Sequence, residues 1–168
     1  HGIAAEAHFP GAGGEAARDA HPFEDADDGE AAGARGAGGI DQVQIDVVVR
    51  NQKVGHTFPG GTNDSNEGWV DFQANIGDRQ VFRNGAIRPD KQVDPSAHFF
   101  QAVLVDKNGK RIARRNAADI YTTVYANVIR PSTSDIARYR FRVPKDANGK
   151  EIKFIADLNW RKFNRTFT

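Results

Sequence analysis

The chain has 168 residues, 39% of them hydrophobic, and a formal net charge of +1 at pH 7. It contains neither cysteine nor methionine, which excludes disulfides, zinc–thiolate sites, iron–sulfur clusters and covalent c-type haem attachment within these residues. No apolar run approaches the ~18 residues that a transmembrane helix needs. Because neither an initiator methionine nor a signal peptide is visible, we expect a processed product or a partial sequence.

The first 39 residues differ in composition from the rest. Residues 1–40 carry eight acidic and two basic side chains, which leaves a balance of +7 on residues 41–168. The segment is rich in alanine and glycine and shows no apolar periodicity, so we predict an extended, irregular arm over residues 1–39. Two short aromatic motifs in it are candidate contacts to a partner protein, and their residues are His8, Phe9, His21 and Phe23.

From Ile40 onward the apolar residues alternate with polar ones, which is the period of a half-buried β-strand. Asn108-Gly109 is typical of a tight hairpin turn, and Asn148-Gly149 predicts a second Asn-Gly turn. We therefore predict one domain over residues 40–168, an all-β, antiparallel, Ig-like β-sandwich of about seven strands. The clearest predicted strands cover residues 43–49, 70–76, 100–104, 120–128, 138–143 and 152–158.

His56 is the histidine with the clearest functional potential. It lies in Gly55-His56-Thr57-Phe58-Pro59-Gly60-Gly61, where glycine allows a sharp turn and proline restricts the residue before it. An imidazole on such a turn suits a haem-iron ligand or a hydrogen-bond acceptor. The alternative is a structural histidine that bonds a backbone carbonyl across the turn.

The other candidate polar sites have simpler explanations beside the functional ones. His98 is expected to start a strand and pack on aromatic side chains. The run Asn63-Asp64-Ser65-Asn66-Glu67 suggests calcium, but it has two carboxylates and lacks EF-hand spacing, so a hydrogen-bonded turn explains it better. Trp69 and Trp160 are either stacking platforms for a sugar or packing residues.

The predicted strand over 138–143 has one apolar and one cationic face. Arg138, Arg140 and Arg142 alternate with Tyr139, Phe141 and Val143. These arginines, and Arg114-Arg115, either lie on a solvated sheet face or contact acidic groups or haem propionates, which guanidinium geometry favours. The basic residues are spread along strands rather than clustered on a helix, so we do not expect nucleic acid as a partner.

Catalytic motifs are missing from the sequence. It has no Gly-x-Ser-x-Gly elbow, phosphate-binding loop, His-Glu-x-x-His or thiol nucleophile, and its paired acids fall in the predicted arm, where nothing would tune their pKa values. We therefore expect a protein that is not an enzyme and that holds no metal of its own.

The segments RNQKVGHTFPGGTNDSNEGWV, VDPSAHFFQAVLVDKNGKRIARRNAADIYTTVY and LNWRKFNRTFT carry a family resemblance. Residues 47–168 resemble the C-terminal, cysteine-free β-domain at the end of some bacterial multihaem c-type cytochromes. The chain departs from that family in having no Cys-x-x-Cys-His haem-attachment motif. The resemblance implies a periplasmic or other extracytoplasmic electron-transfer setting.

Together these features favour a haem-free accessory subunit. It would dock on a c-type cytochrome or on a membrane-bound redox complex, such as a bacterial photosynthetic reaction centre, and stabilise that assembly. One alternative is a haem-binding electron-transfer domain in which His56 and another histidine ligate the iron without covalent attachment. Another alternative is an extracellular surface- or carbohydrate-binding sandwich.

Overall fold

The computed structural model describes residues 3–8, 33–35, 42–52, 54–147, 149–165 and 167, with only the backbone described in the first two ranges. Its regular structure consists of strands and two short 3₁₀ turns, η1 (Ala117–Asp119) and η2 (Lys145–Ala147). Within the described residues, no helix has the length and apolar character needed to cross a membrane. The predicted all-β class is therefore confirmed.

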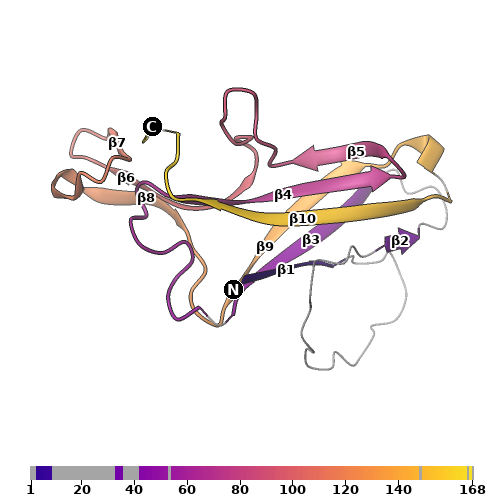
Figure 1. Ribbon diagram of the computed structural model, residues 1–168, viewed down its shortest axis with the longest axis horizontal. Helices are drawn as coiled ribbons and strands as arrows, with labels where there is room; N and C mark the ends of the chain where they lie inside the picture. The colour runs from indigo at the N-terminus through magenta and orange to yellow at the C-terminus, as the bar shows by residue number, and fades with distance from the viewer. Residues whose placement is uncertain are drawn as a thin grey trace.

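Two antiparallel sheets form the sandwich (Figure 1). The smaller sheet has the order β1 (Ile3–His8), β3 (Gln42–Asn51) and β9 (Ser134–Arg142). In the larger sheet, β10 (Glu151–Arg161) pairs with β4 (Glu67–Ile76), and β2 (Gly33–Arg35) pairs with β10. The other edge of β4 is shared by β5 (Arg79–Asn84) and β6 (His98–Val105).

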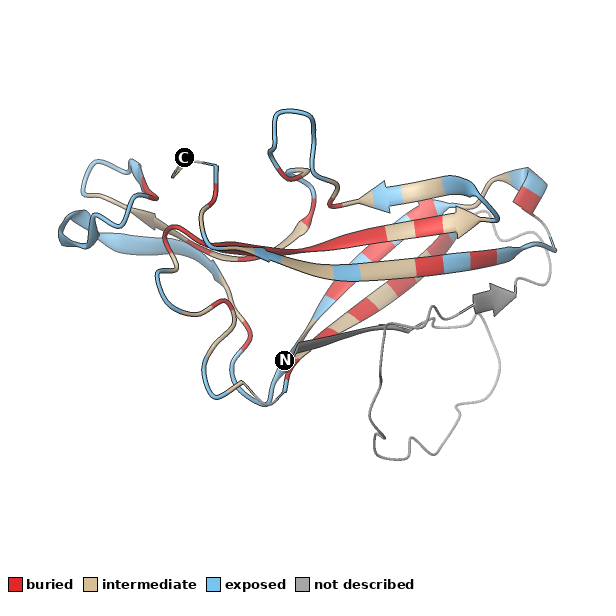
Figure 2. Cartoon of the chain, in the orientation of Figure 1, coloured by how far each residue is buried: buried red, intermediate tan, exposed pale blue. Residues whose placement is uncertain are grey.

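β6 carries the chain beyond the sandwich. Its outer half pairs with β7 (Arg111–Ile112) and with β8 (Thr122–Asn127), and these three strands project at one end of the molecule (Figure 1). Residues 122–126 of β8 are all exposed, in contrast to the buried stripes of β3 and β4 (Figure 2). The projecting part of β8 is therefore not packed against a second sheet of the described chain, unlike the strands of the sandwich.

The core lies between the two sheets and follows from the alternation of the sequence. Val43, Ile45, Val47 and Val49 point inward from β3 and are at most 7% exposed, because side chains two residues apart share one face of a strand. From the opposite sheet, Phe72 stacks on Tyr139 with ring centroids 4.3 Å apart. Other members of the same cluster are Val70, Ala74, Phe100, Ile129, Ala137, Phe141, Ile152 and Phe154.

Two strands fall inside the predicted irregular arm. β1 pairs with β3 so that Ile3 lies opposite Asn51 and His8 opposite Asp46, and β2 pairs with β10. The predicted extended arm thus includes two short strands among the described residues. The physical reason is that ladder hydrogen bonds use backbone groups, so a strand added at a sheet edge needs no apolar alternation of its own.

The turns predicted from glycine occur where the sequence placed them. Gly109 and Gly149 have φ of 79° and 74°, the left-handed region that L-residues with side chains rarely adopt. The N–H of Asp106 donates to the carbonyl of Lys110 at 2.9 Å and closes the β6–β7 hairpin, whereas the turn at Gly149 connects β9 to β10 in the other sheet.

Candidate functional site

The loop that carries His56 is fixed at its start by Asn51, the last residue of β3. Asn51 is 0% exposed, and its Nδ2 donates to the carbonyls of His56 and Ile129, each at 2.9 Å. Its backbone N–H donates to Thr133, and its carbonyl accepts from Ser132, both at 2.9 Å. One buried amide thus joins the histidine loop to residues 129–133.

Phe58 provides the second attachment of this loop. Its N–H and carbonyl exchange hydrogen bonds with Ile129, both at 2.8 Å, and its ring meets that of Phe100 edge-on at 6.0 Å. The next residue, Pro59, is fully buried and follows a cis peptide bond. His56 therefore lies on a backbone that is held on both sides.

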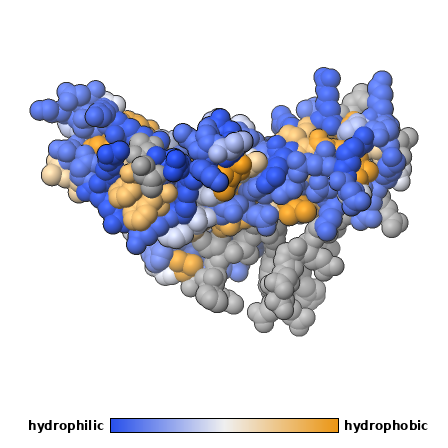
Figure 3. Space-filling view, turned by 45° about the horizontal axis from the view of Figure 1, so that its top comes forward, coloured by the Kyte–Doolittle hydropathy of each residue, from blue (hydrophilic) through white to orange (hydrophobic). Residues whose placement is uncertain are grey.

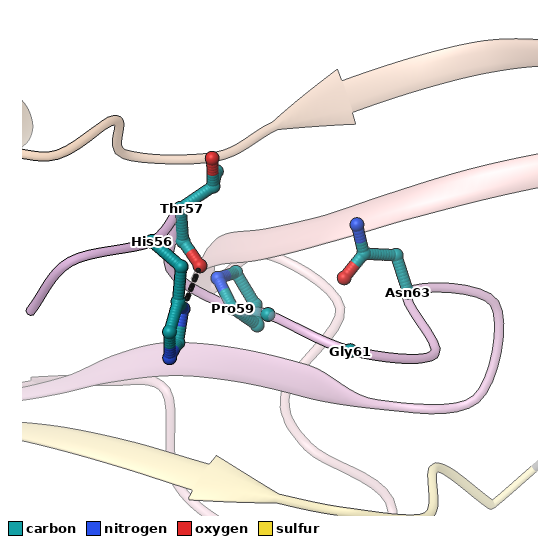
Figure 4. Close-up of a pocket in the computed structure, with 6 residues that line it drawn as sticks. His56, Thr57, Pro59, Gly61 and Asn63 are labelled. Carbon is teal, nitrogen blue, oxygen red and sulfur yellow. Dashed lines mark hydrogen bonds between the residues drawn. The ribbon is translucent and has the colours of Figure 1, made fainter.

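The imidazole of His56 is exposed and has a defined orientation (Figure 4). Its Nδ1 lies 2.9 Å from the carbonyl oxygen of Thr57. Because a carbonyl only accepts hydrogen bonds, Nδ1 is the donor in this contact, and in the neutral ring the lone pair is then on Nε2. This is the arrangement by which second-shell carbonyls orient metal-ligating histidines.

Gly60 allows the ring to take this position. A Cβ on residue 60 would lie 2.6 Å from Nδ1 and 2.8 Å from Cε1 of His56, distances that no side chain tolerates without moving the ring. The glycine at this position is therefore a steric requirement of the observed imidazole orientation.

An open cavity of about 470 Å³ lies beside the ring. It is lined by His56, Thr57, Pro59, Gly60, Gly61 and Asn63. The side-chain oxygen of Asn63 is buried and accepts no hydrogen bond from the residues that the structure describes. Of these groups the exposed imidazole is the one open to a ligand, because the Thr57 carbonyl is bonded to His56 Nδ1 and the Asn63 oxygen is buried.

The carboxylates of the predicted calcium candidate are engaged by protein groups. Asp64 accepts the backbone N–H of Arg115 at 2.7 Å, and Glu67 pairs with Arg161. The segment itself is a turn in which the carbonyl of Thr62 accepts the N–H groups of Ser65 and Asn66 at 3.1 and 3.3 Å. Nowhere in the described ranges do three or more His, Asp or Glu side chains gather as a metal site.

His98 begins β6, and its ring meets Phe100 edge-on at 5.1 Å. Its Nε2 lies 2.7 Å from Oδ2 of Asp135 on β9, and Asn127 Nδ2 donates to the same oxygen at 3.2 Å. Sequence reasoning missed Asp135 and Asn127, and no local signal marks them, since they meet His98 only through the packing of the two sheets.

Burial alone would raise the pKa of Asp135. Hydrogen bonds from His98, Asn127 and the N–H of Ile136 outweigh it and hold the pKa below its ordinary value.

The arginines of β9 share the outer face of the smaller sheet. Arg138 forms two hydrogen bonds with the carboxylate of Asp46, at 2.8 and 3.1 Å, and Arg140 donates to Gln44 at 2.6 Å. Arg142 is exposed and lies opposite Gln42 at the start of β3. The charge of Arg138 is thus balanced within the chain, whereas Arg140 and Arg142 keep theirs available.

The predicted partner-binding residues do not converge on one site. The cationic face flanks the first half of β3, and His56 follows the end of β3. Only the backbone of His8 is described, in β1, and Phe9, His21 and Phe23 lie outside the described residues.

The two tryptophans have different environments. Trp69 is 3% exposed, and its Nε1 donates to the carbonyl of Gly85 at 3.0 Å, so it is a packing residue. Trp160 is 50% exposed. The carbohydrate-binding alternative therefore retains one of its two stacking platforms.

Arg114 and Arg115 also differ. The guanidinium of Arg115 lies 5.0 Å from the ring centroid of Phe163, which stacks on Phe167 at 4.4 Å. Arg114 is exposed.

Comparison of the chain with models of protein families, with curated proteins and with solved structures finds no match.

Proposed function

We propose that this chain is a haem-free, non-catalytic accessory subunit that docks on a c-type cytochrome or a membrane-bound electron-transfer complex outside the cytoplasm. In this proposal, His56 offers its Nε2 to the haem iron or to a polar group of the partner. The sequence resemblance supports this setting, and the geometry of the His56 loop supports this contact.

The observation that carries the proposal is the hydrogen bond from His56 Nδ1 to the Thr57 carbonyl at 2.9 Å. It leaves Nε2 as a lone-pair donor on an exposed ring. A neutral imidazole nitrogen is a common ligand of iron, zinc and copper. Since the ring orientation is set by Gly60 and Thr57, little ordering entropy opposes binding.

A second contact is provided by the outer face of β9. Arg140 and Arg142 are exposed and form no ion pair with a carboxylate among the described residues. Guanidinium groups pair well with carboxylates and haem propionates. We propose that this face steers an acidic partner, while the His56 loop makes the specific contact.

The proposal is tested by titrating the full chain into a ferric c-type haem peptide that has one exchangeable axial position. We expect the Soret band to shift as His56 displaces water from the iron, and we expect His56→Ala to abolish the shift. His98→Gln is the matched control, because the Nε2 of His98 already bonds Asp135 at 2.7 Å. Circular dichroism of each variant checks that the fold is retained.

Two results would contradict the proposed role of His56. One is a shift of equal size with His56→Ala, and the other is a complete absence of any shift with the wild-type chain. A Soret band in the purified chain, before any haem is added, would favour the electron-transfer domain over the accessory subunit.

A further inference from the structure

The projecting end of the molecule carries a concentration of positive charge. We define the basic tip as the β6–β7 hairpin (residues 105–111) together with the loop of residues 113–121. Between Val105 and Tyr121 the sequence has five basic and two acidic residues, a balance of +3. The N–H of Tyr121 donates to the carbonyl of Val105 at 2.9 Å and joins the loop to the hairpin.

Both carboxylates of the basic tip accept hydrogen bonds from other residues of the tip. The carboxylate of Asp106 accepts the N–H groups of Asn108 and Lys110 at 2.8 and 2.9 Å. Asp119 accepts from the side chain of Asn116 at 2.9 Å. In the described part of the chain, no carboxylate pairs with the exposed residues Lys107, Lys110 or Arg114.

Apolar and aromatic side chains protrude beside these cations. Tyr121 is 74% exposed and Ile120 is 39% exposed, and the adjoining strand β8 adds Val124 at 59% and Tyr125 at 47%. No charged residue occurs between Asp119 and Arg130. On the face drawn in Figure 3, by comparison, apolar areas appear as separate patches within a mostly hydrophilic surface.

We propose that the basic tip, with the exposed side chains of β8, attaches the protein end-on to an anionic lipid surface. Lys and Arg are attracted to anionic headgroups, and tyrosine favours the membrane–water interface. Such a layer accommodates protruding side chains without a shaped groove. The anionic headgroups complement the charge of the tip, and the exposed tyrosines favour a lipid surface over an acidic protein.

The position of the tip suits such attachment. The β6–β8 strands project at one end, whereas β10 starts at the other end of the molecule (Figure 1). Attachment through the tip therefore leaves the outer faces of the sandwich open to a protein partner. This inference does not depend on His56 or on any haem contact.

The test is co-sedimentation of the full chain with vesicles of phosphatidylcholine, with and without phosphatidylglycerol. We expect binding only to the vesicles that contain phosphatidylglycerol, and we expect added salt to weaken it. The double variant Lys110→Gln with Arg114→Gln should lose about 25-fold in affinity, at about fivefold per cation. Tyr121→Ser should also weaken binding, because it removes an interfacial aromatic side chain.

The matched control is Lys150→Gln with Lys153→Gln. This variant removes the same charge from exposed lysines at the far end of the molecule, so its binding should change by less than about threefold. An equal loss in the two double variants would overturn the proposal, since the attraction would then be non-specific. Failure of the wild-type chain to bind the anionic vesicles would also overturn it. Retention on polyglutamate without binding to vesicles would assign the tip to an acidic protein instead.

Discussion

His98 and Asp135 join the two sheets of the sandwich through a contact of 2.7 Å between Nε2 and Oδ2. One residue begins β6 of the larger sheet, and the other lies near the start of β9 in the smaller sheet. Asn127, at the end of β8, donates to the same carboxylate at 3.2 Å and to the carbonyl of Phe99 at 2.9 Å. The three side chains thus hold the base of the projecting strands against β9.

We predict that Asp135→Asn lowers the free energy of unfolding at pH 7 by about 1 kcal/mol. The side chain of Asp135 is 35% exposed, so solvent screens part of the interaction. The folded pKa of Asp135 is depressed, so its contribution is present above the unfolded pKa of about 3.9 and is lost as pH falls through the folded pKa. Urea unfolding of both proteins at pH 7 and at pH 3 should show that the difference in unfolding free energy shrinks at the lower pH.

Asp78→Asn, at an exposed turn position, is the control for this prediction. A difference between Asp135→Asn and the wild type that persists unchanged at pH 3 would contradict the explanation.

Gly60→Ala should weaken binding to the ferric haem peptide by about tenfold or more, because a Cβ there would lie 2.6 Å from His56 Nδ1 and would displace the imidazole. Gly55→Ala is the matched control, since a Cβ at residue 55 meets nothing within 4 Å. Spectroscopic titration measures both affinities. Equal affinities of the two variants would show that the orientation of the ring does not matter.

Gly85→Ala should be strongly destabilising. Gly85 has φ of 93°, and a Cβ there would lie 2.1 Å from the carbonyl oxygen of Val70. Because the obstacle is backbone of the central strand β4, we expect a loss of about 2–4 kcal/mol. Gly109→Ala also has positive φ but meets nothing within 4 Å, and it should cost about 1 kcal/mol. Thermal unfolding measures the loss of stability in each variant. A larger loss in Gly85→Ala than in Gly109→Ala reports the steric clash, because both variants share the cost of a positive φ. Equal losses would contradict the clash.

Tyr139→Phe should leave the free energy of unfolding unchanged or raise it by up to about 1 kcal/mol. Tyr139 is 5% exposed, and its hydroxyl has no hydrogen-bond partner among the described residues. Burial, together with the charge of Asp71, raises the pKa of this phenol, so it stays neutral at ordinary pH. Phenylalanine keeps the ring stacked on Phe72. Denaturant unfolding checks the prediction against Tyr125→Phe on exposed β8, where no change is expected. A clear loss of stability in Tyr139→Phe would mean that the hydroxyl is bonded.

Periodicity predicted most of the strands because it is a local property. The alternation over residues 43–49 identifies the inward face of β3, and the alternation over residues 70–74 does the same for β4. β5 was not predicted, because the polar and apolar residues of RQVFRN do not alternate. β7 is two residues long, too short for any periodic signal.

The candidate site was only partly predictable. Glycine and proline around His56 indicate a tight turn, so the sequence predicted that His56 lies on a loop. The hydrogen bond to Thr57 depends on the ring orientation that Gly60 permits. Asn51 was not recognised, because its two carbonyl partners, on His56 and Ile129, come together only after folding.

Local sequence patterns were enough to predict the all-β class, the principal strands and the Asn-Gly turns, since these follow from side-chain alternation and from glycine backbone freedom within a few residues. The tertiary fold, by contrast, determines which polar groups remain available. It paired His98 with Asp135 across 37 residues and Arg138 with Asp46 across 92, and it buried Trp69 while leaving β8 exposed. The physical reason is that strand alternation is set by neighbouring residues, whereas burial and ion pairing depend on which distant strands pack together.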